Sequence, residues 1–249
     1  MIALSTIADT LRAVAGKDMA PATSAIIVAA GNSTRMGKGV SKQLLKLSGV
    51  PVLARTLHAF DCSGYVDEII VVTRPEDMSE VSALLTKYGI KKTVRLVAGG
   101  ATRADSVKRG VMAVNKKTKF VAIHDGARCL ITPQMIKKVL RAAYLHKAAT
   151  AACTVCDTVK IATKRGFIER TENRDLVWLA QTPQVFDINL YHTALANVKD
   201  NSLTDDNQLI EALGYPVKLV DCGADNLKIT RPEDLPRAQA ILAQRRMKK

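Results

Sequence analysis

A chain of 249 residues, 47% hydrophobic and 24% charged, is long enough to bury a core and too apolar to remain disordered. No apolar run approaches the roughly 18 residues of a membrane-spanning helix, so we expect no membrane partner. The net charge of +14 attracts anions, but with only 4% aromatic residues binding of single-stranded nucleic acid by base stacking is poorly supported.

Residues 1–23 mix acids, bases and apolar residues without the apolar core of a signal peptide or the acid-poor balance of a transit peptide. We expect an N-terminal extension, a short amphipathic helix or loose arm, that ends at a turn around Pro21. A single domain is expected to follow over residues 24–249.

The five cysteines are an odd number in a chain that is not small, which favours reduced thiols and a cytoplasmic location over a disulfide scaffold. Cys153 and Cys156 form one C-x-x-C pair, but no second pair or nearby histidine completes the four ligands of a zinc site. The pair lies in an apolar run, which predicts buried thiols.

Apolar runs typical of strands alternate with helical patterns along the chain. Strands are expected at Ala25–Ala30, Glu68–Thr73, Thr93–Val97, Phe120–His124, Thr150–Val155 and Val217–Asp221. This alternation predicts a Rossmann-like α/β fold, with a mostly parallel twisted sheet and helices on both faces. Residues 157–178 break the pattern and are rich in charge, which indicates a protruding β-hairpin arm.

Three helices have clear end signals in the sequence. The first has apolar residues on one face between positions 78 and 88, and Gly89 should end it. The second should begin at Thr132, as N-cap, followed by Pro133 in the first turn. The third should open with a capping box between Thr230 and Glu233.

Ligands of such sheets bind beyond the carboxyl ends of the strands. Three features follow strands there: the glycine-rich loop from Gly31 to Gly37, the pair at positions 99 and 100, and Asp125. The loop is not a Walker A motif, because its glycines are separated by five residues and no Lys-Ser or Lys-Thr pair follows. Its small residues leave room for a base or ribose, while Arg35 and Lys42 bring cations that suit a triphosphate.

The same loop begins a series of segments that resemble one family. The segments are "AAGNSTRMG", "SKQ", "GGATRADSV", "HDGAR", "DTVK", "ENRDLVWLAQTPQVF", "TDD" and "ADNLKITRPEDL". Together they closely resemble the 2-C-methyl-D-erythritol 4-phosphate cytidylyltransferase family of non-mevalonate isoprenoid biosynthesis, over positions of about 24 to 242. Members transfer CMP from CTP to that polyol phosphate, giving 4-diphosphocytidyl-2-C-methyl-D-erythritol and pyrophosphate, without a covalent enzyme intermediate.

The resemblance implies a role for each residue at a matching position. The residues expected to stabilise the reacting phosphorus are Arg35, Lys42 and Lys228. The residues expected to bind CTP are Ala29, Ala30, Gly31, Gly100, Ala101 and Ser106. The residues expected to bind the acceptor are Asp125, Arg128, Thr158, Arg174 and Thr182. The resemblance also implies Mg²⁺, or another divalent cation, near Asp125.

A homodimer is a further implication of the resemblance. In the family the arm exchanges between two subunits, and the arginine that matches Arg174 reaches the neighbour's site. The chain departs from the family pattern at Ala101, where an acidic residue is frequent, and at Ser41 and Cys129, where proline is usual. These departures remove no cation, but Ala101 leaves the selection of cytosine open.

Two alternatives remain open from the residues. A cytidylyltransferase for another polyol phosphate, such as ribitol 5-phosphate, would differ mainly in the acceptor pocket. A non-catalytic nucleotide- or nucleic-acid-binding protein is suggested by the charge of +14, but it would be expected to lack some of the catalytic positions. His124 has no required role as a base, because a phosphate monoester is already a nucleophile, and we expect it to pack within its strand.

Overall fold

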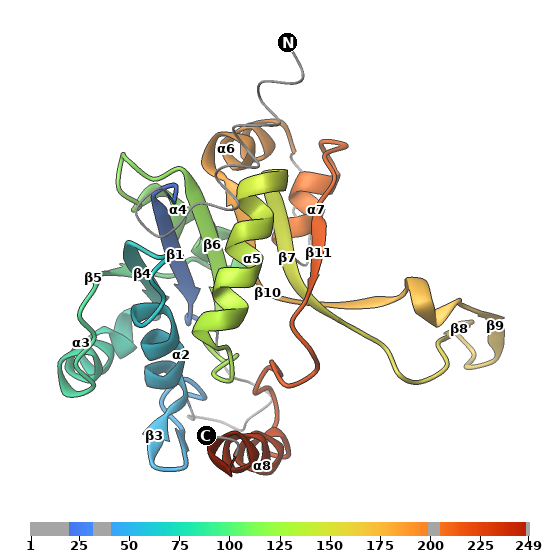
Figure 1. Cartoon of the computed structure of the whole chain (residues 1–249), viewed down its shortest axis with the longest axis horizontal. Coiled ribbons are helices and arrows are strands. Elements are labelled where there is room, and N and C mark those ends of the chain that lie inside the picture. Colours follow the sequence, from blue (N-terminus) through green and yellow to red (C-terminus); the bar gives the residue numbers. More distant parts are fainter. Residues whose placement is uncertain (1–19, 32–40, 199–204, 248–249) are drawn as a thin grey trace.

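The computed structural model describes residues 20–31, 41–198 and 205–247. Its centre is a seven-stranded sheet with the order β11-β7-β10-β6-β1-β4-β5 (Figure 1). Its strands are β1 (Thr23–Val28), β4 (Glu68–Thr73), β5 (Thr93–Ala98), β6 (Phe120–Asp125), β7 (Ala148–Thr154), β10 (Trp178–Asp187) and β11 (Lys218–Asp221). All run parallel except β10, which lies antiparallel between β6 and β7. The predicted α/β sheet is therefore confirmed.

Helices cover both faces of this sheet, as predicted. One face packs against α2 (Val52–Asp61), α3 (Met78–Lys87) and α5 (Pro133–His146). The other face packs against α4 (Arg103–Met112), α6 (Ile188–Asn197) and α7 (Asp206–Glu211). Successive strand residues point to opposite faces, so Ile27 joins the first core and Ile26 the second, both fully buried.

Every predicted strand is present, with ends that differ by a few residues, but the sequence pattern missed β10. This strand is ten residues long and contains Gln181, Thr182, Pro183 and Gln184, with a register shift against β7 between positions 180 and 184. A central strand with buried polar residues and a proline lacks the apolar run that marked the other strands. Its polar groups are instead satisfied by neighbouring loops.

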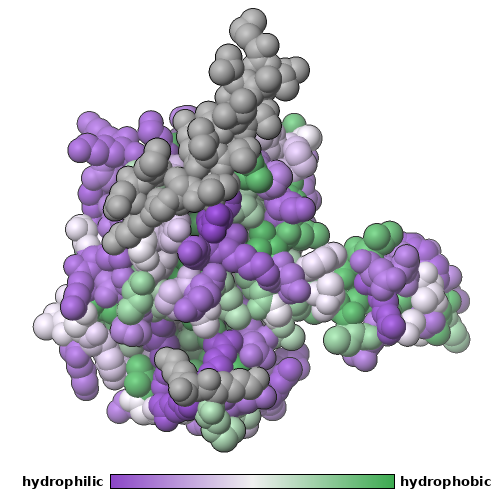
Figure 2. Space-filling view, in the orientation of Figure 1, coloured by the Kyte–Doolittle hydropathy of each residue, from purple (hydrophilic) through white to green (hydrophobic). Residues whose placement is uncertain are grey.

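The charged stretch at 157–178 forms the predicted arm. It contains β8 (Lys160–Ala162), β9 (Ile168–Thr171) and the 3₁₀ turn η4 (Arg174–Leu176), and it projects well away from the sheet (Figure 1). Figure 2 shows hydrophobic side chains on its surface among the polar ones. Phe167 and Ile168 are 69% and 67% exposed in the single chain. Adjacent exposed apolar side chains of this size are typical of a surface that contacts another molecule.

The helix signals are confirmed in two of three cases. The α3 helix ends before Gly89, whose φ of +59° is left-handed, and Thr132 caps α5 by accepting a hydrogen bond from the backbone N–H of Met135. The third prediction was wrong, because α8 (Asp234–Met247) begins beyond the expected capping box. The Asp234 carboxylate instead accepts hydrogen bonds from the backbone N–H groups of Thr230 and the next residue.

The α8 helix packs beside the small hairpin of β2 (Lys46–Leu47) and β3 (Val50–Pro51), near the carboxyl edge of the sheet (Figure 1). A short 3₁₀ helix, η3 (Pro75–Asp77), precedes α3. Of the predicted extension, residues 1–19 lie outside the described part of the chain. No helix in the described ranges is long and apolar enough to cross a membrane.

The cysteines are all free thiols. Cys153 is buried as predicted, but Cys156 is exposed, because the chain leaves the sheet after β7 and enters the arm. Within the described ranges, no three His, Cys, Asp or Glu side chains gather as metal ligands. Burial raises the pKa of both Cys129 and Cys222 to about 11, so these two thiols are poor nucleophiles.

Candidate active site

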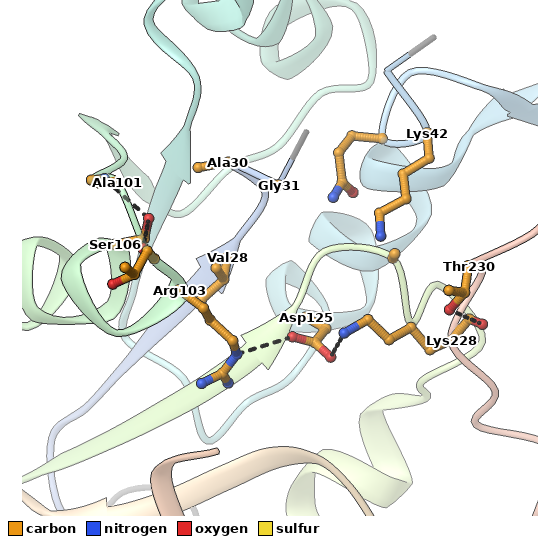
Figure 3. Close-up of a pocket in the computed structure, with 14 residues that line it drawn as sticks. Val28, Ala30, Gly31, Lys42, Ala101, Arg103, Ser106, Asp125, Lys228 and Thr230 are labelled. Carbon is orange, nitrogen blue, oxygen red and sulfur yellow. Dashed lines mark hydrogen bonds and ion pairs between the residues drawn. The ribbon is translucent and has the colours of Figure 1, made fainter. Parts of the chain in front are cut away.

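A cavity of about 420 Å³ lies at the carboxyl ends of β1, β5 and β6, where a parallel sheet is expected to bind its ligand. One side of it is made of small residues and a hydroxyl (Figure 3): Ala30, Gly31, Gly100, Ala101 and Ser106. The charged side chains that line it are Lys42, Arg103, Asp125 and Lys228. The cavity therefore joins a flat, uncharged wall to a group of three cations and one carboxylate.

The uncharged wall is held by the start of α4. Thr102 caps that helix in a capping box with Asp105, which fixes the turn before it. The buried Ser106 hydroxyl accepts a hydrogen bond from the backbone N–H of Gly100 at 3.1 Å and donates one to the carbonyl of Thr102 at 2.9 Å. Ser106 is thus built into the loop that forms this wall of the cavity. A side chain at Gly99 would overlap the Cβ of Ala30, so glycine keeps this wall thin.

Asp125 is the only acidic side chain lining the cavity among the described residues. It ends β6, is buried, and its backbone N–H donates to the Thr182 hydroxyl at 3.1 Å. Lys228 Nζ lies 2.8 Å from Oδ2, while Arg128 Nε and Arg103 Nε lie 3.7 Å and 3.8 Å from the carboxylate. Burial alone would raise the pKa of Asp125, but these cations outweigh it and lower that pKa to about 2. The carboxylate is therefore ionised at neutral pH.

Lys228 reaches the cavity from the segment after β11. The backbone N–H of Ile229 donates to the carbonyl of Ala127 at 2.9 Å. The fully buried Asn226 side chain donates to the Gln181 side chain and to the carbonyl of Thr182, both at 2.9 Å. These contacts tie the lysine segment to β10 and to the turn after β6, so the ammonium group is presented from a fixed loop.

His124 packs within β6 as predicted. Its ring is fully buried, with Nδ1 3.0 Å from the Thr182 hydroxyl and Nε2 3.2 Å from the carbonyl of Arg128. Burial lowers the pKa of His124 to about 3, because the charged ring would lose its hydration. The neutral ring supports the Asp125 turn from behind and does not line the cavity.

The predicted site residues fall into four groups. Those that line the cavity are Lys42, Lys228, Ala30, Gly31, Gly100, Ala101, Ser106 and Asp125. Those that lie behind its wall are Ala29, Arg128 and Thr182. Those that are exposed near or on the arm, away from the cavity, are Thr158 and Arg174. The predicted Arg35 lies outside the described residues.

The prediction that Ala29 contacts the nucleotide is therefore not supported by its position. Ala29 is 1% exposed, and its backbone N–H donates to the carbonyl of Val72 within the sheet. Its side chain belongs to the core between β1 and the helices on one face. Of the described residues in this segment, Val28, Ala30 and Gly31 line the cavity.

The sequence analysis missed Arg103 and Gln43, which also line the cavity. Both were inside quoted segments, "GGATRADSV" and "SKQ", but nothing in the spacing distinguished them from helix-surface residues. Arg103 is the first residue of α4, and its side chain turns toward Asp125 (Figure 3). A cation in the first turn of a helix interacts unfavourably with the helix dipole. The arginine at this position was therefore the one signal in the sequence that the residue is there for a reason other than helix stability.

Comparisons with known proteins agree with this geometry. Residues 23–244 match the model of the 2-C-methyl-D-erythritol 4-phosphate cytidylyltransferase family. A protein of that name from Caldanaerobacter subterraneus subsp. tengcongensis is 44% identical over 222 residues, covering 88% of this chain and 98% of the relative. Another from Pelotomaculum thermopropionicum is 41% identical over 225 residues, covering 89% and 94%.

Solved structures give the same result. The crystal structure of 4-diphosphocytidyl-2C-methyl-D-erythritol synthase from Anaerococcus prevotii is 34% identical, with a TM-score of 0.79 over 89% of this chain and 96% of that one. The cytidylyltransferase from Thermus thermophilus is 32% identical, with a TM-score of 0.70 over 88% and 98%. A bifunctional enzyme from Campylobacter jejuni matches over only 54% of its length, so it carries a further part that this chain does not match. The chain belongs to the 2-C-methyl-D-erythritol 4-phosphate cytidylyltransferase family.

Proposed function

We propose that this protein transfers CMP from CTP to 2-C-methyl-D-erythritol 4-phosphate and releases pyrophosphate. The observation that carries the proposal is the cavity at the carboxyl edge of the sheet, which is lined by Lys42, Arg103, Asp125 and Lys228. It lies in a chain whose residues 23–244 match the family model. The relatives described above are named for this acceptor, and none of those names supports the ribitol phosphate alternative. Those names do not support the alternative of a non-catalytic binder either.

The cations have a clear task in this reaction. An attacking phosphate monoester and a triphosphate repel each other, and negative charge grows around the α-phosphorus in the transition state. Lys42 and Lys228 both point into the cavity and would offset that charge, joined by Arg35 from outside the described residues. Lys228 now pairs with Asp125 at 2.8 Å, so it would exchange this carboxylate for a phosphate oxygen when CTP binds.

The cytosine ring would lie against the uncharged wall. Gly100 and Ser106 present backbone and hydroxyl groups there, and Ala30 and Gly31 leave room for a flat ring. Ala101 lines the same wall with a methyl group, so any contact from this position would come from its backbone. This arrangement supports selection of the base by main-chain groups.

Mg²⁺ fits this cavity only as a partner of the bound triphosphate. Asp125 supplies one ionised carboxylate, and its Oδ1 lies 3.8 Å from Arg103, beyond hydrogen-bonding distance. Mg²⁺ commonly uses one or two carboxylates and takes phosphate oxygens and water as its other ligands. When bound, the ion would neutralise phosphate charge, and Asp125 would hold it.

We also propose a homodimer with exchanged arms. Thr158 and Arg174 are exposed and do not line the cavity of their own chain, so an acceptor role requires a second subunit. The arm and its base carry exposed apolar side chains, including Phe167, Leu176 and Leu179, which a partner would cover. Within one chain Arg128 and Thr182 lie beside Asp125 and would form the remaining part of the acceptor site.

A cytoplasmic location is proposed on the cysteines. All five are free, and two of them are exposed, which suits a reducing compartment. No pair among them is bridged, although Cys153 and Cys156 are close in sequence.

The experiment that tests the function is release of pyrophosphate with CTP and Mg²⁺, with methylerythritol phosphate and ribitol 5-phosphate offered separately. We expect release with the first acceptor alone, loss of release in EDTA, and recovery when Mg²⁺ is added back. Release with ribitol 5-phosphate alone would keep the chemistry and contradict the acceptor. No release with either acceptor would contradict the proposed activity.

A further inference from the structure

A chain of buried polar contacts reaches the cavity from the face of the sheet covered by α6 and α7. Asp206 is the first residue of α7 and its side chain is 6% exposed. One of its oxygens accepts a hydrogen bond from the Tyr191 hydroxyl at 2.7 Å, and the other pairs with Arg103 Nη1 at 2.7 Å. Its backbone N–H donates to the side chain of Gln184 in β10 at 3.0 Å. Asp206 is therefore fixed from three directions.

Arg103 continues this chain into the cavity. With Nη1 held by Asp206, its Nε lies 3.8 Å from Oδ1 of Asp125. Lys228 contacts the other carboxylate oxygen of Asp125, so the two cations lie on opposite sides of it (Figure 3). Burial would lower the pKa of Arg103, but the two carboxylates outweigh it and raise that pKa, so the guanidinium remains charged.

We infer that Arg103 and Asp206 are positioning residues for CMP transfer, with Asp206 orienting the Arg103 guanidinium and Arg103 fixing the carboxylate of Asp125. The inference rests on the proposed function. If Lys228 leaves Asp125 for a phosphate oxygen, Asp125 needs a cation that stays in place. Arg103 meets that need, because its second partner, Asp206, lies outside the cavity and is not displaced by the substrates. Arg128 also lies 3.7 Å from Asp125, but it is proposed to bind the acceptor.

A purely structural ion pair is the competing explanation. A buried pair can be retained with little effect on function, and breaking it destabilises a protein whatever it does. The two explanations differ in kinetics. A positioning role lowers the rate of the chemical step, whereas a structural role lowers stability and leaves the turnover of the folded protein unchanged.

Neighbouring aspartates provide a matched pair of variants. Asp206→Asn keeps the size of the side chain and removes the charge that holds Arg103. Asp205→Asn makes the same change one residue earlier, where the carboxylate caps α7 through Gln208 and accepts from Gln184, without contact to Arg103. We expect Asp206→Asn to lower kcat by about 10- to 100-fold, with KM for both substrates within about threefold. Asp205→Asn should lower the melting temperature only.

A second variant covers the case in which Asp206→Asn does not fold. Arg103→Lys keeps a cation beside Asp206, but a single ammonium group cannot bridge two carboxylates as the guanidinium does. We expect Arg103→Lys to fold and to have a kcat lowered about tenfold or more. Asp206→Glu, which keeps the negative charge, should have a higher kcat than Asp206→Asn. Crystals of Arg103→Lys grown with CTP should show Asp125 turned from its present position.

Two results would overturn the inference. One is unchanged kcat in folded Arg103→Lys. The other is a rise in KM for one substrate with kcat unchanged, which would make Arg103 a substrate-binding group. The unaltered protein is assayed beside the variants: absence of turnover there contradicts the proposed function, whereas normal turnover by all variants contradicts only the positioning role.

Discussion

Two buried carboxylates, at opposite edges of the sheet on the two strands that flank β1, have very different surroundings. Glu68 begins β4 beside a cavity of about 320 Å³, and its Oε1 accepts hydrogen bonds from the Ser24 hydroxyl at 2.6 Å and the backbone N–H of Asn115 at 2.5 Å. Asp125 ends β6 beside the cavity of about 420 Å³, and Lys228 holds it at 2.8 Å. The hydrogen bonds that Glu68 accepts come mainly from neutral hydroxyl and backbone groups of the sheet and its turns, whereas the partners of the Asp125 carboxylate are long cationic side chains.

The difference shows how one sheet separates stability from chemistry. Neutral donors fixed by strands and turns stay in place when a ligand binds, so Glu68 serves the fold. Cations on flexible stems can turn from a carboxylate to a phosphate, so the Asp125 cluster can change partners. A polar cavity with a buried acid is therefore not sufficient evidence for an active site, and the kind of partner decides.

The largest effect is expected from Lys228→Ala. Removing a cation aimed at the reacting phosphorus should lower kcat by about 100- to 1,000-fold. The fold should be kept, because Arg103 and Arg128 still pair with Asp125. Steady-state kinetics and a thermal melt check this, with Lys138→Ala on the exposed side of α5 as control. Near-normal turnover would remove Lys228 from the catalytic group.

The next effect extends the comparison to the arm. Arg174→Ala should raise KM for the acceptor or lower kcat by about tenfold to 100-fold, with CTP binding unchanged, because the exposed arginine is proposed to serve a partner's site. The Arg174→Ala and Lys228→Ala proteins, unfolded together and refolded, should regain about a quarter of normal activity, since half the dimers are mixed and each contains one intact site. Absence of recovery would contradict arm exchange.

A smaller effect on stability, and none on turnover, is expected from Glu68→Gln. The change removes the charge that strengthens the hydrogen bonds from Ser24 and Asn115 and that pairs with Arg95 at 3.7 Å, and it should cost about 1–3 kcal/mol of unfolding free energy. Urea unfolding measures the loss, and kcat at a temperature where the variant is folded should equal that of the unaltered protein. A fall in kcat would mean that the two ends of the sheet are coupled.

The last effect concerns stability at acidic pH and His124. Its pKa is about 3 in the folded protein and near 6.5 when unfolded, so the unfolded chain binds the extra proton between these values. Unfolding free energy should therefore fall as pH drops below about 6.5, by at most about 1.4 kcal/mol per pH unit from this residue. In metal-free protein, His124→Asn should show a shallower slope between pH 6.5 and 4. Equal slopes would contradict the buried neutral ring.

Sequence patterns predicted the parts of the fold that depend on local signals. Apolar runs located six strands, and the cap at Thr132 and the stop at Gly89 located helix ends. The strand β10 escaped because long-range contacts satisfy its polar residues, and no local pattern reports such contacts. The start of α8 was misjudged because Asp234 supplies the cap from inside the helix.

Site residues could be predicted where a recognisable motif lies at or after the end of a strand, as for Asp125 at the end of β6 and Lys228 after β11. Arg103 could not be singled out, because its importance comes from meeting Asp206, which is about a hundred positions further along the chain. The exposed position of Arg174 shows the complementary limit, since a residue proposed to serve a second subunit lies away from the cavity of its own chain.

The most direct test of this account is a crystal structure of the protein with CTP and Mg²⁺. We predict the cytosine ring against Gly100 and Ser106, the phosphates between Lys42 and Lys228, and Lys228 withdrawn from Asp125 while Arg103 remains beside it. CTP bound elsewhere, or bound here with the Lys228–Asp125 contact still at 2.8 Å and no lysine at the phosphates, would contradict it.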